Sequence, residues 1–269
     1  MGDTMGEESS FNAASAAQVV YIMGFAGAGK STLAKEFSEF LRDLGYRVAI
    51  ANLDPGAEIL PYKPDYDVRS MVRLVDIMRR ENLGPNGGLI RATEIIVERI
   101  SEVIDYLQRL ARLNDWLLVD TTGQLELFAF RELGERIVTM LELPSVGIYL
   151  VDASMFSKPS DVVMTQLISL AIQYRLGINV ITIVNKIDSE RIPVRVLMEE
   201  FFFKPEDFKQ RISSSDLGVL ADLAYDLIDS ITRYLPPTRV ITISALKRTG
   251  FDDLYSILHE TFCTCGDMT

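Results

Sequence analysis

The segment Gly24-Phe25-Ala26-Gly27-Ala28-Gly29-Lys30-Ser31 places three glycines, a lysine and a hydroxyl within eight residues. It fits G-x-x-x-x-G-K-[ST], the phosphate-binding loop that joins a strand to a helix. Small residues let main-chain N–H groups approach phosphate oxygens, and the following helix adds the positive end of its dipole. We expect Lys30 to neutralise the β- and γ-phosphates and Ser31 to bind Mg²⁺. Phosphate contacts are predicted for Gly27, Ala28, Gly29, Lys30, Ser31 and Thr32.

A second motif follows the apolar run WLLVD at residues 116–120. The run predicts a buried strand that ends at Asp120, with Gly123 three residues later. An aspartate at this position can hold the water shell of Mg²⁺, and the Gly123 N–H can contact a γ-phosphate. The loop over 120–128 would then sense whether the γ-phosphate is present.

The base is indicated by Asn185-Lys186-Ile187-Asp188, an N-K-x-D pattern at the end of a later strand. Asp188 can accept two hydrogen bonds from N1–H and the 2-amino group of guanine, which adenine does not present. Lys186 can lay its methylene stem along the base, and Asn185 can tie this segment to the phosphate loop. A main-chain N–H of Ser244-Ala245-Leu246 can contact guanine O6. The sequence therefore predicts GTP rather than ATP as the ligand.

Two further segments lie where strand ends would face a nucleotide crevice. Asn52-Leu53-Asp54-Pro55-Gly56 follows the second predicted strand, and Asp54 could reach the γ-phosphate, the Mg²⁺ shell or the attacking water. Asp-Pro-Gly is also an ordinary turn sequence. Leu83-Gly84-Pro85-Asn86-Gly87-Gly88 precedes a predicted helix and, from its chemistry alone, reads as a loop and helix start. Neither segment by itself decides the class of protein.

These motifs need a scaffold whose strands end at one edge. Short apolar runs predict strands that are covered on both faces, and the amphipathic stretches between them predict helices. Their alternation indicates an α/β fold of the P-loop NTPase type, a doubly wound and mainly parallel sheet with a helical insertion. We expect strands at 18–23, 47–53, 116–120, 145–152, 179–185 and 239–244, and helices at 33–44, 68–80, 93–113, 130–141, 161–176 and 252–262.

The chain is predicted to form one domain over residues 18–262. The helical insertion covers about 194–235, where no strand pattern occurs. Residues 1–17 are acidic and rich in Ser and Ala, which predicts a disordered leader and not a signal peptide. Residues 263–269 are predicted to be a C-terminal tail.

Composition argues against several classes of partner. The 269 residues include 27 Lys and Arg against 38 Asp and Glu, a net charge of −11, which disfavours general attraction to nucleic acid or to an anionic membrane. No segment approaches the ~20 consecutive apolar residues of a membrane span. The cysteines, Cys263 and Cys265, stand at the C-terminus, where they cannot staple the fold. This usage favours a reducing compartment, so we expect a cytoplasmic protein.

The combination of GFAGAGKS, LDPG, LGPNGG, DTTGQLELF and NKID resembles the GPN-loop GTPases, a family named for its Gly-Pro-Asn loop. The resemblance covers essentially residues 18–262, and the compact length is similar to that of archaeal members. It implies a GTP-hydrolysing homodimer in which Gly84, Pro85 and Asn86 of one subunit contact phosphate in the other. It also implies a switch that assists assembly of a multisubunit complex such as RNA polymerase. Thr122 stands where proline is usual and Gly56 where alanine is usual, but neither change removes a chemical group.

Hydrolysis requires an in-line water and charge compensation on the β–γ bridge. The phosphate-loop amides, Lys30 and Mg²⁺ would supply the charge, and no arginine is placed by a motif for this task. We predict that Asn86 of the partner subunit and Gln124 position the water, with Asp54 orienting it or holding the Mg²⁺ shell. The predicted catalytic residues are thus Asp54, Asn86 and Gln124, and the predicted metal ligands are Ser31, Asp54 and Asp120.

Two other functions are compatible with a phosphate loop. A P-loop kinase would pass the γ-phosphate to an acceptor, but the NKID segment and the lack of an acceptor motif argue against it. A metal-delivery GTPase is suggested by Cys263-x-Cys265, although two thiolates and His259 make a poor four-ligand site. Release of free phosphate without an acceptor, and thiol-dependent metal binding, would separate these functions.

Overall fold

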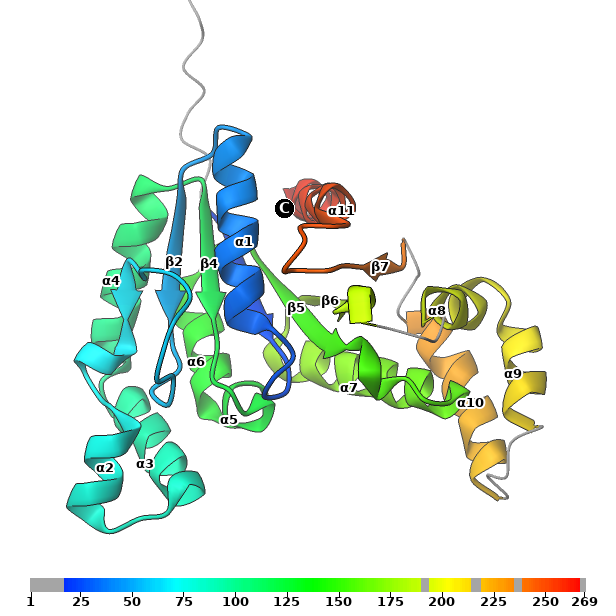
Figure 1. The fold of residues 1–269 in the computed structure, drawn as a ribbon, viewed down its shortest axis with the longest axis horizontal. Helices are drawn as coiled ribbons and strands as arrows, with labels where there is room; N and C mark the ends of the chain where they lie inside the picture. The colour runs from blue at the N-terminus through cyan, green and yellow to red at the C-terminus, as the bar shows by residue number, and fades with distance from the viewer. Residues whose placement is uncertain (1–16, 190–193, 214–218, 235–238, 267–269) are drawn as a thin grey trace, which may run out of the picture.

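The computed structural model describes residues 17–189, 194–213, 219–234 and 239–266. Its centre is a seven-stranded sheet with the order β3-β2-β4-β1-β5-β6-β7, in which all paired strands are parallel. Parallel neighbours bring the carboxyl ends of the strands to one edge (Figure 1). The strands are β1 Gln18–Met23, β2 Val48–Asn52, β3 Tyr66–Asp67, β4 Trp116–Asp120, β5 Ser145–Asp152, β6 Asn179–Asn185 and β7 Ile241–Thr242.

Helices cover both faces of the sheet. On one face, α1 (Lys30–Asp43) and α11 (Phe251–Gly266) pack on alternate residues of the strands, such as Val20 and Ile22. The other face carries most of the remaining helices (Figure 1). The remaining α-helices of the described residues are α2 Leu74–Glu81, α3 Pro85–Glu98, α4 Ile100–Leu113, α5 Leu125–Ala129, α6 Glu132–Leu141, α7 Pro159–Leu176, α8 Val194–Phe203, α9 Pro205–Ser213 and α10 Val219–Tyr234. No helix within the described ranges is long and apolar enough to cross a membrane.

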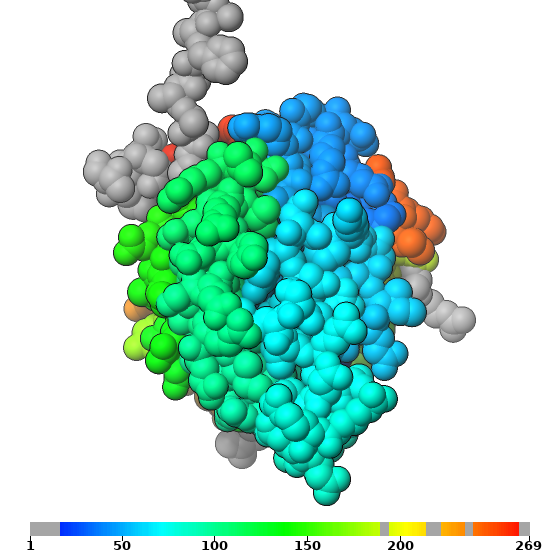
Figure 2. All heavy atoms as spheres, turned by 90° about the vertical axis from the view of Figure 1, so that its left-hand side faces the viewer, coloured from blue at the N-terminus to red at the C-terminus, as the bar shows by residue number. Residues whose placement is uncertain are grey.

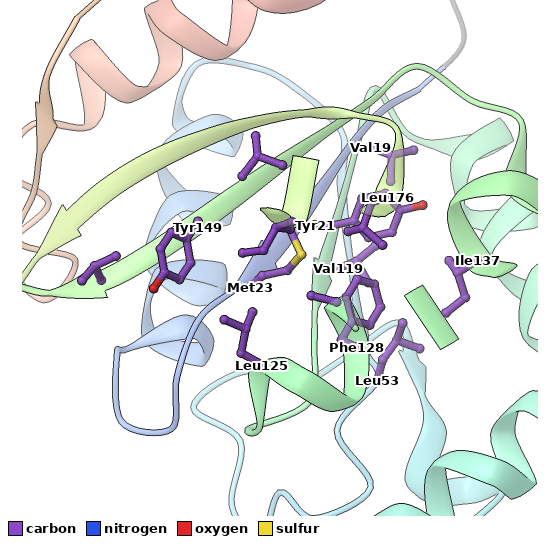
Figure 3. Close-up of a cluster of buried hydrophobic side chains, with 14 of the residues drawn as sticks. Val19, Tyr21, Met23, Leu53, Val119, Leu125, Phe128, Ile137, Tyr149 and Leu176 are labelled. Atoms are coloured by element: carbon purple, nitrogen blue, oxygen red, sulfur yellow. The ribbon is translucent and has the colours of Figure 1, made fainter. Parts of the chain in front are cut away.

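The larger core lies between the sheet and the helices α4 to α7. Figure 3 shows Tyr21 of β1, Tyr149 of β5 and Phe128 of α5 among the buried side chains of this core. The rings of Tyr21 and Phe128 lie 5.8 Å apart between centroids, and both residues are fully buried. Phe128 directly follows the DTTGQLEL segment, so core packing fixes the far end of that loop.

The strands at 18–23, 116–120, 145–152 and 179–185 are confirmed to the residue, and the doubly wound parallel sheet is confirmed. β3 was not predicted, because a strand of two residues is too short to show a hydrophobic pattern in the sequence. The single helix expected over 93–113 is wrong: α3 and α4 are separated at Arg99, whose backbone leaves helical geometry at φ −111° and ψ 27°.

The start of α3 lies before residue 93, where the helix was expected to begin. The helix begins at Pro85, with Gly84 as its N-cap, so the Gly-Pro-Asn segment is a helix N-terminus. Proline is favoured at this first position because its missing N–H would have no helical partner. Gly87 and Gly88 lower helix propensity, but a Cβ on Gly88 would come within 2.8 Å of Leu74 and 2.9 Å of Met78. Close packing of α2 on α3 therefore overrides propensity here.

The helical insertion predicted over about 194–235 contains three helices among the described residues, α8 to α10. They lie at the opposite end of the molecule from α2 and α3 (Figure 1). The α2–α3 pair extends past the carboxyl ends of β2 and β4, and Figure 2 shows this cyan segment as the lower tip of the molecule. At the C-terminus, α11 continues to Gly266, past the tail boundary predicted at Cys263, because no helix-breaking residue intervenes. The leader predicted for residues 1–17 lies almost wholly outside the described residues.

Candidate nucleotide site

The loop between β1 and α1 has a backbone that only glycine accommodates at two positions. Gly29 has φ +98°, and a Cβ there would lie 2.5 Å from Asn185 Nδ2. A Cβ on Gly24, at φ +153°, would lie 2.3 Å from the main-chain oxygen of Leu150. Side chains are therefore excluded for packing reasons as well as for access to a phosphate.

Lys30 is held in place across this loop. Its ammonium donates to the carbonyl oxygens of Gly24 at 2.9 Å and Phe25 at 3.2 Å. Burial lowers the pKa of Lys30, whereas the charges of Asp120 and Asp54 act in the opposite direction. The amine thus lies between the phosphate loop and two carboxylates, where it can compensate phosphate charge.

Asp120 ends β4 and is 1% exposed. Its Oδ2 accepts a hydrogen bond of 2.7 Å from the hydroxyl of Tyr62, whereas its Oδ1 has no hydrogen-bond partner among the described residues. Burial raises the pKa of Asp120 to about 6; Tyr62, the Ser31 hydroxyl and Lys30 act to lower it. The position contains a costly buried carboxylate with one oxygen unsatisfied, which is typical of a site that receives a cation.

Asp54 occupies the space next to the D-x-x-G loop. Its Oδ1 accepts from Gly56 N–H at 2.8 Å, and its Oδ2 accepts from Gly123 N–H at 2.9 Å. Burial raises the pKa of Asp54, although these two N–H groups and Lys30 favour the ionised form. The Gly123 N–H, which was predicted to contact a γ-phosphate, is therefore bound here by a carboxylate.

Asn185 joins the phosphate loop to the last two strands. Its Nδ2 donates to Ala28 O at 2.9 Å, and its Oδ1 accepts from Ala245 N–H at 2.9 Å. The side chain is thus placed as the sequence predicted, against the phosphate loop. Because Ala245 N–H is used by Asn185, the N–H of Leu246 is the group of this turn that has no acceptor among the described residues. Leu246 is the better candidate for guanine O6.

A pocket of about 250 Å³ lies beside this turn. Lys186 crosses toward the phosphate loop, with its Nζ 2.7 Å from Gly27 O and 2.5 Å from Asp152 Oδ2. Asp188 is exposed at the rim, where a hydrogen bond from Ser244 holds the pKa of its carboxyl below the usual value and Lys247 adds to the effect. The pocket is lined by Gly29, Thr32, Asn185, Lys186, Asp188, Ser244, Ala245 and Leu246.

Gln124 and the Gly-Pro-Asn segment lie side by side within one chain. Gln124 Nε2 donates to Asn86 Oδ1 at 3.2 Å. Gly84, Pro85 and Asn86 are all exposed. The structure thus brings two of the predicted water-positioning residues together in the same subunit. The contact of Asn86 with a second subunit stays a prediction.

Sequence reasoning missed four residues that position the site. Tyr62 contacts Asp120, and Asp152 contacts Lys186. Arg69 binds Asp67 through two nitrogens and donates from Nη1 to Ala57 O at 2.8 Å, which fixes the loop after β2. Asp67 and Arg69 stand two residues apart, a spacing that could have indicated them, whereas Tyr62 has no motif and is found only from the fold.

Known proteins resemble this chain over most of its length. A family model described as "Conserved hypothetical ATP binding protein" matches residues 22–264. GPN-loop GTPase PAB0955 of Pyrococcus abyssi is 38% identical over 93% of this chain and all of that protein. GPN-loop GTPase 1 of Dictyostelium discoideum is 26% identical over 88% of this chain and 59% of that protein.

The crystal structure of PAB0955, described as a GTPase in apo form, superimposes with a TM-score of 0.83 over 92% of this chain and 98% of that one, at 36% identity. The description of the family model names ATP, but the relatives are named as GTPases, and this chain carries the N-K-x-D segment in the lining of the pocket beside the phosphate loop. Sequence and structure agree over nearly the whole length, so this chain belongs to the GPN-loop GTPase family and is a GTP-binding GTPase.

Proposed function

We propose that this GTPase is a Mg²⁺-dependent molecular switch in which the loop over residues 53–65 responds to the γ-phosphate. The observation that carries the proposal is the hydrogen bond from Gly123 N–H to Asp54 Oδ2. A γ-phosphate that takes this N–H must displace the carboxylate, because two anions cannot share one donor at short distance without a large repulsion. Tyr62, at the far end of the same loop, is bonded to Asp120. Displacement of Asp54 would therefore move a loop that is attached at both ends of the DTTG segment.

Magnesium fits the oxygen groups beside the phosphate loop. Asp120 Oδ1 is buried without a hydrogen-bond partner in the described residues, and Ser31 and Asp54 add hard oxygen ligands of the kind Mg²⁺ prefers. When bound, the cation would offset negative charge on the β- and γ-phosphates. We propose that Ser31, Asp54 and Asp120 hold the cation or its water shell.

We propose that the attacking water is positioned by Gln124 of one subunit and Asn86 of its partner. Within one chain Gln124 and Asn86 are hydrogen-bonded to each other, so the proposal requires that this bond opens when Asn86 enters the partner's site. Lys30 contributes positive charge, because its Nζ lies against the phosphate loop and 3.5 Å from Gly123 O. Asp54, once released from Gly123, would be a carboxylate free to accept a hydrogen bond from that water.

The switch is expected to show in the exchange behaviour of the loop over 53–65. Amide hydrogen exchange should differ in this loop between the protein with GDP and the protein with a non-hydrolysable GTP analogue, both with Mg²⁺. The Asp54→Asn variant serves as the control, because an amide competes less strongly with a phosphate for Gly123 N–H. Equal exchange of this loop in the two wild-type complexes would refute the switch.

We also propose a homodimer in which Asn86 of each subunit acts in the site of the other. The family resemblance and the exposure of Gly84, Pro85 and Asn86 support this arrangement. Mixing the Lys30→Ala and Asn86→Ala variants tests it, since each is expected to be inactive alone. If Asn86 acts across the dimer, a 1:1 mixture that exchanges subunits regains about a quarter of wild-type hydrolysis, from one complete site in half of the dimers. A mixture that stays inactive after exchange assigns Asn86 to its own chain.

The cellular role we propose is assembly of a multisubunit complex such as RNA polymerase, on the basis of the family resemblance. The net charge of −11 argues for protein clients and against direct contact with nucleic acid. Client capture should depend on the nucleotide, so proteins bound in the presence of a non-hydrolysable GTP analogue are compared with those bound in GDP. Identical sets of bound proteins would contradict a nucleotide-controlled assembly factor.

A further inference from the structure

The turn after β7 is attached to the helix that follows the phosphate loop. Ser244 and Thr249 exchange two main-chain hydrogen bonds of 3.2 Å, which closes the turn on itself. Arg248 lies within it in the left-handed backbone region, at φ +55°, which is sparsely populated for residues other than glycine. Such a conformation persists where the surrounding contacts hold it.

The contacts that hold Arg248 come from α1. Its Nε donates to Glu36 Oε2 at 2.8 Å, its Nη2 donates to Glu39, and its Nη1 lies 3.5 Å from Asp43 Oδ2. The three acids follow a spacing of three and four residues, which places them on one face of the helix. The Glu36 side chain is only 13% exposed, so this part of the cluster is shielded from solvent.

Arg248 connects two elements that carry different parts of the predicted nucleotide contacts. The turn carries contacts to the base, and α1 carries contacts to the phosphates. The turn carries Leu246 N–H, without an acceptor among the described residues, and Ala245 N–H, bonded to Asn185. The helix α1 begins at Lys30 and continues through Ser31. We propose that Arg248 is a positioning residue for guanine recognition, which holds the turn of Leu246 at a fixed separation from the phosphate loop. The inference rests on the proposed placement of the base in the pocket beside Asn185.

A positive charge beside the acids of α1 is not enough to position the turn of Leu246. Lys35 contacts the same two glutamates, with its Nζ 2.6 Å from Glu36 Oε1 and 3.6 Å from Glu39 Oε1. Both partners of Lys35 belong to α1, so its ion pairs do not connect the helix to the turn. Lys35 is therefore the matched control: it adds the same charge to the same acids without a link to the base pocket.

The test compares Arg248→Gln with Lys35→Gln in the full-length protein. We expect Arg248→Gln to raise the dissociation constant for GDP and the KM for GTP by roughly 3- to 10-fold, with kcat changed less than twofold, because the turn loses its fixed position but no reacting group is removed. Lys35→Gln should leave all three values within twofold of wild type. Arg248→Lys, which keeps the charge but loses the planar fork, should fall between.

Salt gives a second readout, because it separates the loss of the Arg248 ion pairs from the loss of side-chain packing. The advantage of wild type over Arg248→Gln should shrink as the ionic strength rises from 0.1 to 1 M, since partly exposed ion pairs are screened. Equal dissociation constants for wild type, Arg248→Gln and Lys35→Gln would overturn the proposal. Equal losses in Arg248→Gln and Lys35→Gln would also overturn it, because charge alone would then account for the effect.

Asp188→Asn separates failure of this inference from failure of the base site. If the pocket binds guanine as proposed, Asp188→Asn shifts preference from GDP toward xanthosine diphosphate, whose O2 can accept from the asparagine amide. When that shift occurs but Arg248→Gln binds GDP like wild type, the base site stands and the role of Arg248 is refuted. When no shift occurs, the base site itself is misplaced and the inference fails with it.

Discussion

Without nucleotide or divalent cations, replacement of Asp120 by asparagine should stabilise the folded protein at neutral pH. Burial raises the pKa of this carboxyl from its ordinary 3.8 to about 6, so the folded state holds the proton more tightly than the unfolded state does. Ionisation in the fold is therefore penalised. The penalty develops as the pH rises from about 4 and is complete above the folded pKa near 6. Asparagine has the same shape and does not ionise.

The magnitude follows from the two pKa values. The difference between about 6 and 3.8 corresponds to about 3 kcal/mol of unfolding free energy at 1.36 kcal/mol per pH unit. By this linkage the advantage of Asp120→Asn over wild type should grow from roughly 1.6 kcal/mol at pH 5 to about 3 kcal/mol at pH 8. If the asparagine amide makes a weaker hydrogen bond than the carboxyl did, the unfolding free energy of the variant falls by the same amount at every pH. The increase of the difference with pH is unchanged.

Urea unfolding monitored by circular dichroism in EDTA, between pH 5 and 8, measures the difference. Asp188→Asn is the control, because the pKa of Asp188 is lowered by Ser244 and its ionisation is therefore favoured in the fold. That variant should show no gain in stability as the pH rises. The reasoning about Asp120 is refuted if its variant is less stable than wild type at pH 8, or if the difference between them does not widen with pH.

The close contacts and hydrogen bonds around the loops give three further predictions. Gly29→Ala should weaken GDP binding more than tenfold in calorimetry, because its Cβ would lie 2.5 Å from Asn185 Nδ2; near wild-type affinity would contradict the geometry. Asn185→Ala should lower the unfolding free energy in urea by about 2–5 kcal/mol, since two buried main-chain partners lose their bonds, and a loss under ~1 kcal/mol would count against this pairing. Tyr62→Phe should raise the Mg²⁺ concentration for half-maximal hydrolysis a few-fold while sparing the rate at saturation, because Asp120 loses its donor; an unchanged Mg²⁺ titration would argue against it.

The parts of this fold that sequence predicted are those with local causes. Apolar runs gave the strands because a parallel strand covered on both faces needs apolar residues throughout. The phosphate loop was predictable because its backbone needs positive φ angles that favour glycine, as Gly27 and Gly29 show. The position of Asn185 against this loop also followed, since its motif occurs at a strand end on the same edge of the sheet.

The parts that escaped have non-local causes. The start of α3 at Pro85 depends on Gly88 packing against Met78 of another helix, which overrides the poor helix propensity of two glycines. Tyr62 reaches Asp120 across 58 positions of sequence, and Arg248 reaches Glu36 across 212. No period or spacing in the sequence encodes such contacts, because they exist only once the sheet has brought the loops together.

The electrostatics of the site explain how a chain with a net charge of −11 can bind a polyanion. The charge of Asp54 adds to the burial that raises the pKa of Asp120, and the charge of Lys30 lowers the pKa of both carboxyls. A triphosphate added to this group would increase the negative charge in a buried space, where repulsion is poorly screened. Entry of a divalent cation with the nucleotide removes that conflict, and it would bring a partner to the unpaired oxygen of Asp120. The same excess of negative charge would drive Asp54 away from Gly123 when the γ-phosphate arrives, so acidity at the site supports both the proposed metal requirement and the proposed switch.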